Sequence, residues 1–220
     1  MAGMPDFDDI KLTGRPLIVC DIDEVVLEFV TPFRDFLRSQ GHDLLPRSFR
    51  LTGNVVLENT GEPVAEGDVK ALLEAFFLVQ ESWQVPAPRA VETLESLARD
   101  ADLIFLTAMP PRHTAIRRAL LDRHDLHYPL LATEDAKGPV IRQLTAQAPV
   151  PTAFLDDIAR NLHSVRDSVP DCLLIHLMAN EGFRRMAPPA GDGVLLAESW
   201  DEAEVLIRKH FFGETNSDRR

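Results

Sequence analysis

The sequence has few cysteines, and neither of them belongs to a metal-binding or redox motif. Cys20 and Cys172 are the only two among 220 residues. Both lie in or beside apolar runs, as small buried side chains do. The absence of a Cys-x-x-Cys pattern argues against a zinc site or a redox dithiol. Two isolated cysteines also argue against a disulfide framework, so we expect a reducing compartment and a cytoplasmic protein.

A long hydrophobic run and an excess of positive charge are also missing. No apolar stretch approaches the roughly 18 residues that cross a membrane, and the acidic segment 1–13 does not resemble a signal peptide. Acidic residues number 35 against 23 basic ones, which gives a net charge of −12. We therefore expect neither nucleic acid nor a membrane as partner. A small phosphorylated molecule stays compatible, because the charges near a site decide what binds there. Nothing in the sequence predicts the oligomeric state.

Apolar runs alternate with helical patterns over 15–30 and 86–212. The expected strands are Leu17–Cys20, Leu103–Leu106, Pro129–Leu131, Thr152–Leu155, Cys172–His176 and Val194–Leu196. The expected helices are Pro88–Arg99, Arg112–Arg123, Lys137–Thr145, Ile158–Ser168 and Trp200–Phe212. This alternation predicts an α/β fold, a three-layer Rossmann-like core around a central parallel sheet.

The segment 31–85 interrupts this alternation and is interpreted as a small, mainly helical inserted lobe. Phe33 marks a short helix, and Glu66–Gln80 has apolar residues at helical spacing. Between them, Ser48–Val64 is predicted to form a hairpin, with its turn at Asn59–Glu62. We expect 1–14 and 213–220 to be flexible tails.

Several core strands end in side chains that carry oxygen. Asp21 and Asp23 follow the first strand, Thr107 ends the second, and the pair 156–157 (Asp-Asp) ends the fourth. Lys137 opens the helix before the fourth strand. Because ligands bind at the carboxyl ends of parallel strands, we expect these groups to meet at one edge of the sheet. Crowded carboxylates predict a hard cation such as Mg²⁺, while a hydroxyl and an ammonium suit an anion.

Each of these residues also has a purely structural explanation. Thr107 is a plausible cap for the following helix, and Asp156 and Asp157 are suited to cap the helix near Ile158. Lys137 by itself resembles an ordinary solvated lysine. The functional interpretation rests on the coincidence of all of them.

In this order and spacing, the patterns resemble the four motifs of the haloacid-dehalogenase-like (HAD) hydrolase superfamily. The first motif is matched by the segment 21–25 (Asp-Ile-Asp-Glu-Val), the second by Leu103–Thr107, the third by Lys137 and the fourth by Phe154–Asp157. The resemblance implies the HAD core fold. It also implies that the lobe 31–85 is a type 1 (C1) cap, which covers the site and selects the substrate.

The resemblance implies a role for each matched residue. Asp21 would be the nucleophile that forms an aspartyl-phosphate. Asp23 would protonate the leaving alcohol and then activate water. Thr107 and Ala108 would bind the phosphoryl oxygens together with Lys137, which would also hold Asp21 ionised.

A Mg²⁺ site is implied by the same motifs. Its ligands would be Asp21, the main-chain carbonyl of Asp23, and the final acid pair. Asp157 is expected to ligate directly, whereas Asp156 would act through water or pair with Lys137.

The second aspartate of the first motif distinguishes two chemistries. Dehalogenases of the superfamily lack it, and phosphatases retain it, so Asp23 favours phosphoryl transfer. The expected activity is a Mg²⁺-dependent phosphomonoesterase acting on a small phosphorylated metabolite. One alternative is a non-catalytic protein of the same fold that binds a phosphate or a partner. A receiver domain is a further alternative, but there the acid pair comes first in the chain.

Residues that select the substrate are harder to assign. Four arginines are candidates for binding a second anionic group, although each is also compatible with an ordinary surface position: Arg34, Arg47, Arg50 and Arg112. His113 follows the second motif closely enough to face the site. Phe77 and Trp83 are interpreted as core of the inserted lobe rather than a stacking surface.

Overall fold

Six parallel strands form the central sheet of the computed structural model, which describes residues 7, 10–147 and 149–213. The strand order is β5-β4-β1-β6-β7-β8. The strands are β1 (Leu17–Cys20), β4 (Asp102–Thr107), β5 (Leu130–Ala132), β6 (Thr152–Asp156), β7 (Leu173–Leu177) and β8 (Val194–Ala197). Every residue of β1 is buried, as expected for a strand covered on both faces. The six strands predicted from the sequence are confirmed.

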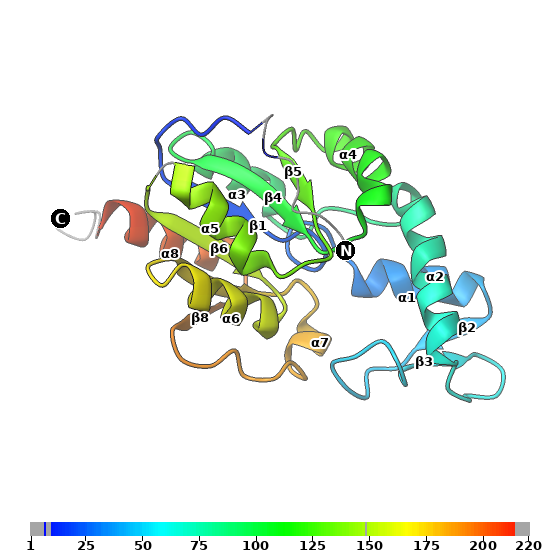
Figure 1. Cartoon of the computed structure of the whole chain (residues 1–220). Helices are drawn as coiled ribbons and strands as arrows, with labels where there is room; N and C mark the ends of the chain where they lie inside the picture. Colours follow the sequence, from blue (N-terminus) through cyan, green and yellow to red (C-terminus); the bar gives the residue numbers. More distant parts are fainter. Residues whose placement is uncertain (1–6, 8–9, 148, 214–220) are drawn as a thin grey trace, which may run out of the picture.

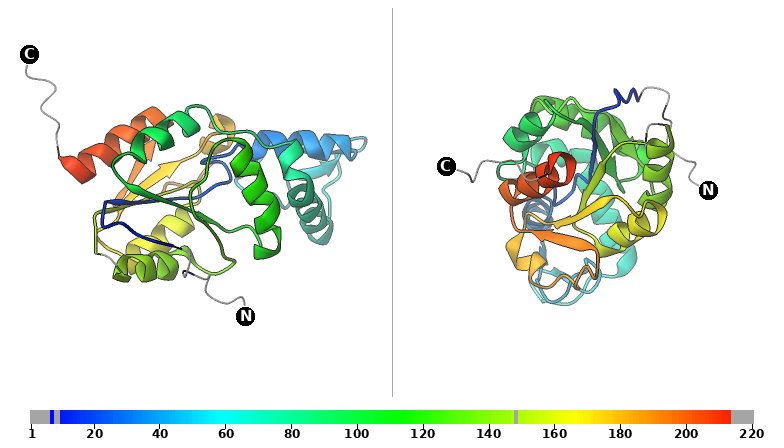
Figure 2. Two further views of the ribbon diagram at one scale, coloured as in Figure 1. Left: turned by 90° about the horizontal axis from the view of Figure 1, so that it is seen from above. Right: turned by 90° about the vertical axis from the view of Figure 1, so that its left-hand side faces the viewer.

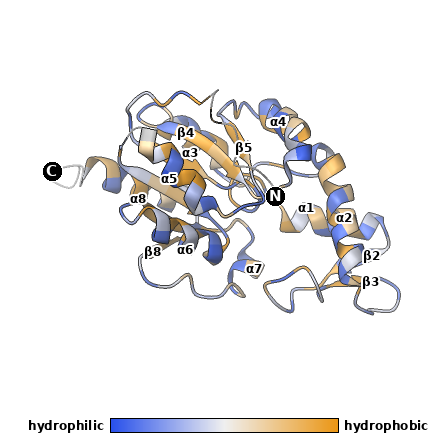
Figure 3. Cartoon of the chain, viewed as in Figure 1, coloured by the Kyte–Doolittle hydropathy of each residue, from blue (hydrophilic) through white to orange (hydrophobic). Residues whose placement is uncertain are grey.

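Helices cover both faces of the sheet, so the predicted three-layer core is confirmed (Figure 1). The helices around one cluster of buried apolar residues are α3 (Ala90–Leu97), α4 (Thr114–Arg123) and α8 (Trp200–Phe212). On the other face, α5 (Lys137–Gln147) and α6 (Ala159–Ser168) pack against a second cluster. Ile18 belongs to the first cluster and Val19 to the second, because successive side chains of a strand point to opposite faces. Figure 3 shows β4 and β5 as mainly hydrophobic strands, whereas the helices around the sheet mix hydrophilic and hydrophobic residues.

A second lobe lies beyond the carboxyl ends of the strands, at the end of the molecule opposite the C-terminal end of α8 (Figures 1 and 2). It contains α1 (Val30–Ser39), β2 (His42–Leu44), β3 (Val55–Leu57), α2 (Glu66–Val79) and the 3₁₀ turn η1 (Gln80–Ser82). Phe33 and Phe76 pack edge to face within its core, with ring centroids 5.3 Å apart. The boundaries 31–85 for an inserted domain stay a prediction.

The hairpin of this lobe begins earlier than predicted. β3 pairs antiparallel with β2, so the hairpin spans residues 42–57 rather than 48–64. β2 was not predicted because it is short and polar, without an apolar pattern. Its Asp43 forms ion pairs with Arg34 and Arg38 of α1. The predicted turn at 59–62 exists, but only the single bridge between Val56 and Pro63 follows it.

Several described residues of the segment predicted as an N-terminal tail contact the core. Ile10 and Leu12 pack against the apolar cluster beneath α5 and α6. Thr13 donates its main-chain N–H to Asp102 at 2.6 Å. Residues 1–6, 8–9 and 214–220 of the predicted tails lie outside the described part of the chain.

Two further short helical elements follow the carboxyl ends of β4 and β7. The 3₁₀ turn η2 (Pro111–His113) precedes α4, and α7 (Glu181–Arg184) follows β7. The described residues contain no helix long and apolar enough to cross a membrane.

The first turn of α5 packs very closely against α6. Gly138 follows Lys137, and a Cβ atom built on Gly138 would lie 2.0 Å from the main-chain oxygen of Ser164. The Gly138 N–H donates to the Ser164 hydroxyl at 3.1 Å. A glycine is therefore required at this position, and it fixes the start of α5 beside the sheet.

We predict that Gly138→Ala destabilises the fold, because the methyl group forces α5 away from α6. The expected loss in the free energy of unfolding is about 1 to 3 kcal/mol, measured by urea denaturation. Gly67→Ala is the matched control, because Gly67 also lies in a helix but has open space around it. It should stabilise the protein by about 0.5 kcal/mol. Equal effects of the two substitutions would contradict this account.

Candidate active site

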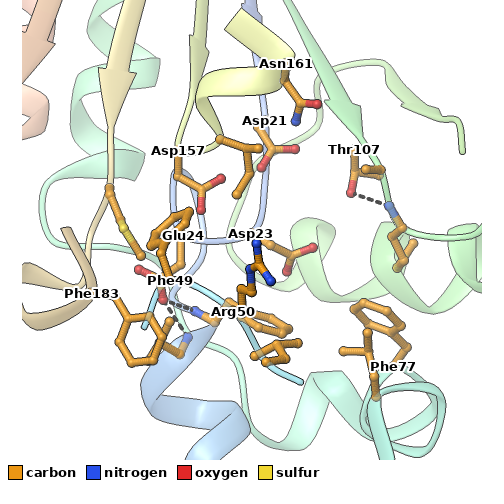
Figure 4. Close-up of a pocket in the computed structure, with 18 of the residues that line it drawn as sticks. Asp21, Asp23, Glu24, Phe49, Arg50, Phe77, Thr107, Asp157, Asn161 and Phe183 are labelled. Carbon is orange, nitrogen blue, oxygen red and sulfur yellow. Dashed lines mark hydrogen bonds between the residues drawn. The ribbon is translucent and has the colours of Figure 1, made fainter. Parts of the chain in front are cut away.

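Three carboxyl groups meet where β1 and β6 end. Oxygens of Asp21, Asp156 and Asp157 lie within 4.8 Å of one another. All three residues are buried, and Figure 4 shows Asp21 and Asp157 side by side at the wall of a pocket. β1 and β6 are hydrogen-bonded neighbours in the sheet, so the predicted convergence of positions 21 and 157 is present.

Lys137 lies between two of these carboxylates. Its Nζ donates to Asp21 Oδ1 at 2.5 Å and to Asp156 Oδ2 at 2.7 Å. Only 1% of the lysine side chain is exposed, so the explanation as a solvated lysine is excluded. Burial disfavours the ammonium, but Asp156 and Asp21 outweigh this effect and raise the lysine pKa. Lys137 is therefore held as a cation.

Asp156 and Asp157 occupy different environments. Asp156 is fully buried, and besides Lys137 it accepts hydrogen bonds from the Ile158 N–H at 2.8 Å and from the Asn161 side chain at 3.0 Å. Asp156 thus contacts the start of α6, but no side chain caps this helix at its N-cap, Ile158, so the explanation of the acid pair as helix caps is not supported. Asp157 lines the pocket. Its main-chain oxygen is 2.8 Å from Nε2 of His176, which must carry a proton to donate there.

The pKa values of two acids reflect their burial. Burial raises the pKa of Asp21 to about 7, although the nearby Lys137 ammonium acts in the opposite direction. Burial also raises the pKa of Asp157 well above its usual value, and the negative charges of Asp156 and Asp21 add to the effect. The protein alone therefore resists full ionisation of this cluster.

Thr107 ends β4, the strand next to β1. Its hydroxyl oxygen accepts the Met109 N–H at 3.1 Å, which leaves the hydroxyl hydrogen for another acceptor. Thr107 and Ala108 both line the pocket that contains Asp21. Their predicted role in phosphate binding is compatible with this location and stays a prediction.

The Asp23 carboxylate turns away from the acid cluster. It accepts hydrogen bonds from Arg117 at 2.9 Å and from Gln84 at 2.8 Å. Arg117 is fully buried in α4 and also bonds to Gln80. Asp23 still borders the pocket, so it is held at the wall by residues from α4 and from the end of the second lobe. The proposed contact of its main-chain carbonyl with a metal stays a prediction.

Sequence reasoning missed Arg117, although the sequence carries a signal for it. Arg117 lies three and four positions before Leu120 and Leu121, both fully buried. A charged side chain on the apolar face of a helix requires a buried partner. That partner is Asp23.

Glu24 was also missed, and it joins three segments around the site. Its carboxylate accepts main-chain N–H groups from Phe29, Val30 and Asn180, at 2.5 to 2.9 Å. Burial raises its pKa, while these three donors act in the opposite direction. Glu24 itself has a positive φ of 64°. This turn connects β1, the start of α1 and the loop after β7.

The residues considered as substrate-binding candidates lie in different parts of the structure. Arg34 pairs with Asp43 and Arg112 with Glu74. His113 is buried but points to Glu74 of α2, with Nε2 2.8 Å from the carboxylate. Among the four candidate arginines, Arg50 lines the pocket and Arg47 does not. Phe77 is both part of the lobe core and part of the pocket wall.

The donor set fits a Mg²⁺ ion. Asp21, Asp156 and Asp157 carry three negative charges when ionised, and Lys137 carries one positive charge, which leaves a formal charge of −2. Carboxylate oxygens are the ligands that Mg²⁺ prefers. Asp157 and Asp21 line the pocket and would hold the ion, whereas Asp156 lies behind them and bonds to Lys137, the Ile158 N–H and Asn161.

Comparison with known proteins gives the fold class. The sequence matches no protein-family model and no curated protein. The structure is similar to that of a haloacid dehalogenase-like family hydrolase from Xanthomonas campestris, at 10% identity and a TM-score of 0.59, over 90% of this chain and 96% of that one. A predicted phosphoglycolate phosphatase from Haemophilus somnus aligns at 14% identity and a TM-score of 0.54, over 89% and 99%. A HAD family hydrolase from Deinococcus radiodurans with bound phosphate and sodium aligns at 13% identity and a TM-score of 0.58, over 88% of this chain and 95% of that one. The chain has the haloacid-dehalogenase-like fold, as its four motifs predicted.

We predict that Mg²⁺ stabilises the protein more at high pH than at low pH. Asp21 has a pKa of about 7 when folded and an ordinary, lower value when unfolded. Between these values the folded state binds more protons, so the metal-free protein loses stability as the pH rises. Mg²⁺ competes with those protons. The increase in melting temperature on adding Mg²⁺ should be larger at about pH 8 than at about pH 5.5. An equal or larger increase at the lower pH would refute the predicted competition.

We also predict energetic coupling between Arg117 and Asp23. Arg117→Met should lower the free energy of unfolding by about 2 kcal/mol, because it leaves a partly buried carboxylate without its ion pair. Combined with Asp23→Asn, the two losses should differ from additivity by about 1 to 2 kcal/mol. Arg123→Met is the control, since Arg123 lies on the same helix and pairs at the surface with Glu81. Its effect should add to that of Asp23→Asn within about 0.5 kcal/mol; additivity in both cycles would show that the pair is energetically unimportant.

Proposed function

We propose that this protein is a Mg²⁺-dependent phosphomonoesterase that acts on a small phosphorylated molecule through an aspartyl-phosphate. The observation that carries the proposal is the buried cluster of Asp21, Asp156 and Asp157 with Lys137 between two of its members. Burying three carboxylates and one ammonium costs desolvation free energy, so this cluster is not explained by a contribution to the stability of the fold. It suits a site that accepts a cation and a phosphoryl group together.

In the first half-reaction, a carboxylate oxygen of Asp21 attacks phosphorus and the bond from phosphorus to the ester oxygen breaks. Asp23, which must take up a proton from solvent before this step, would give that proton to the departing alcohol. Arg117 and Gln84 then hold the carboxylate that remains. Lys137, Thr107 and the main chain at Ala108 would stabilise the phosphoryl oxygens. When bound, Mg²⁺ supplies charge neutralisation.

In the second half-reaction, Asp23 accepts a proton from water, whose oxygen attacks the phosphorus of the aspartyl-phosphate. The bond between phosphorus and Asp21 breaks, and inorganic phosphate is released. Asp23 thereby returns to its protonated form, and Asp21 returns to its ionised form. The position of Asp23 at the pocket wall, away from the acid cluster, fits a residue that exchanges protons with the leaving group and with water.

Support also comes from the structural neighbours. One of them is described as a predicted phosphoglycolate phosphatase, and another contains bound phosphate. The alternative is a protein of the same fold that binds a phosphate or a partner without turnover. A panel of phosphate esters, with Mg²⁺ or with a chelator, separates the two. Turnover that requires Mg²⁺ and is abolished in Asp21→Asn supports the enzyme, whereas phosphate binding without turnover on the whole panel supports the alternative.

We predict opposite effects for two substitutions at the site. Asp23→Asn should slow turnover on the order of 10² to 10⁴-fold, because the leaving alcohol loses its proton source. Its Mg²⁺ affinity should stay nearly unchanged, because the side chain lies outside the acid cluster. Asp157→Ala should weaken Mg²⁺ binding first. Calorimetric titration with Mg²⁺, together with kcat for an alkyl phosphate whose leaving alcohol requires a proton, measures both properties, and a large loss of metal affinity in Asp23→Asn would contradict the assignment.

A further inference from the structure

The pocket above the acid cluster has mostly apolar walls. It has a volume of about 510 Å³, within the range of small-molecule sites. Both lobes contribute to the walls. The apolar side chains that argue most directly for its character are Phe49, Leu51, Leu73, Phe77, Met109 and Phe183. Figure 4 shows Phe49, Phe77 and Phe183 around the end of the pocket opposite Asp21.

The polar side chains of these walls already have protein partners. Glu74 is paired with Arg112 and His113. Asn161 donates to Asp156, and Glu24 accepts three main-chain N–H groups. Beyond the residues assigned to the reaction, few polar groups remain for a substrate.

Arg50 is the exception among the described residues of the walls. It is the one positively charged side chain that lines the pocket. The described residues form no ion pair with it, and its side chain reaches in the direction of Asp23 (Figure 4). Arg50 can bind the phosphate group, but a single cation does not supply the several hydrogen bonds that a sugar with many hydroxyl groups needs.

We propose that the substrate is a phosphate monoester of an apolar alcohol, whose alkyl or aryl group occupies the part of the pocket lined by Leu73 and Phe77. This inference rests on the proposed function and adds the class of leaving group. The ester bond from phosphorus to the alcohol oxygen breaks, the alcohol leaves with the proton of Asp23, and water supplies the oxygen of inorganic phosphate. A polyhydroxylated alcohol would lose its hydrogen bonds to water against walls that offer few replacements.

Binding of unreactive analogues tests the apolar pocket without relying on turnover. Ethyl-, butyl- and hexylphosphonate are titrated into the protein with Mg²⁺ in a calorimeter. The affinity should increase by about tenfold or more from ethyl to hexyl, with an increasingly negative heat-capacity change. Equal affinities along the series would overturn the proposal.

Turnover of matched esters separates this inference from the proposed function. Hexyl phosphate and glucose 6-phosphate are both esters of primary alcohols, so their leaving groups have similar intrinsic reactivity. We expect kcat/KM to be about tenfold or more higher for hexyl phosphate. Turnover of glucose 6-phosphate at an equal or higher kcat/KM would overturn the inference and leave the phosphatase proposal intact. If no ester is hydrolysed but affinity still rises along the phosphonate series, the proposed enzyme fails and the apolar pocket stands.

Two variants of α2 localise the effect. Leu73→Gln places a polar group in the wall and should reduce the preference for hexylphosphonate over ethylphosphonate by about tenfold. Leu78→Gln is the matched control, because Leu78 is 59% exposed and lies outside the pocket walls. It should leave the preference unchanged. An unchanged preference in Leu73→Gln, with both variants folded by circular dichroism, would overturn the assignment of this wall.

Discussion

The ion pairs of Lys137 with Asp21 and Asp156 are the interaction on which the site depends. Three carboxylates that meet in a buried space repel one another, and burial makes each charge costly. One fully buried ammonium compensates part of that charge and holds Asp21 next to the pocket. With all three acids ionised, the cluster keeps a formal charge of −2, which a divalent cation would neutralise. Gly138 serves the same arrangement, because it allows α5 to begin where Lys137 reaches both acids.

A second constraint ties the two lobes to this centre. Glu24 collects the main-chain donors of the segment entering α1 and of the loop after β7. Arg117 links Asp23 in the core to Gln80 and Gln84 at the end of the second lobe. Residues next to the acid cluster therefore also form the contacts between the core and the second lobe.

The core and the acid cluster were accessible from sequence, because their determinants are local. Continuous apolar runs such as Leu17–Cys20 predict buried strands. Because parallel strands end at the same edge of the sheet, the residues that follow them lie close together there. Partners across long sequence separations were less accessible. Arg117 reaches Asp23 across 94 positions, and β2 pairs through a segment without an apolar pattern. The pocket walls depend on how two lobes approach each other, which no single segment encodes. The catalytic roles of the site residues, the metal and the cytoplasmic location stay predictions.

The central claim is that Asp21 becomes phosphorylated in a site completed by a divalent cation. Trapping the intermediate tests it most directly: the protein is mixed with a phosphate ester and Mg²⁺, quenched in acid, digested and analysed by peptide mass spectrometry. The account predicts a phosphoryl group on Asp21 that is absent in Asp21→Asn and when Mg²⁺ is chelated. Hydrolysis of the ester with the phosphoryl group found on a different residue, or undiminished in Asp21→Asn, would contradict it.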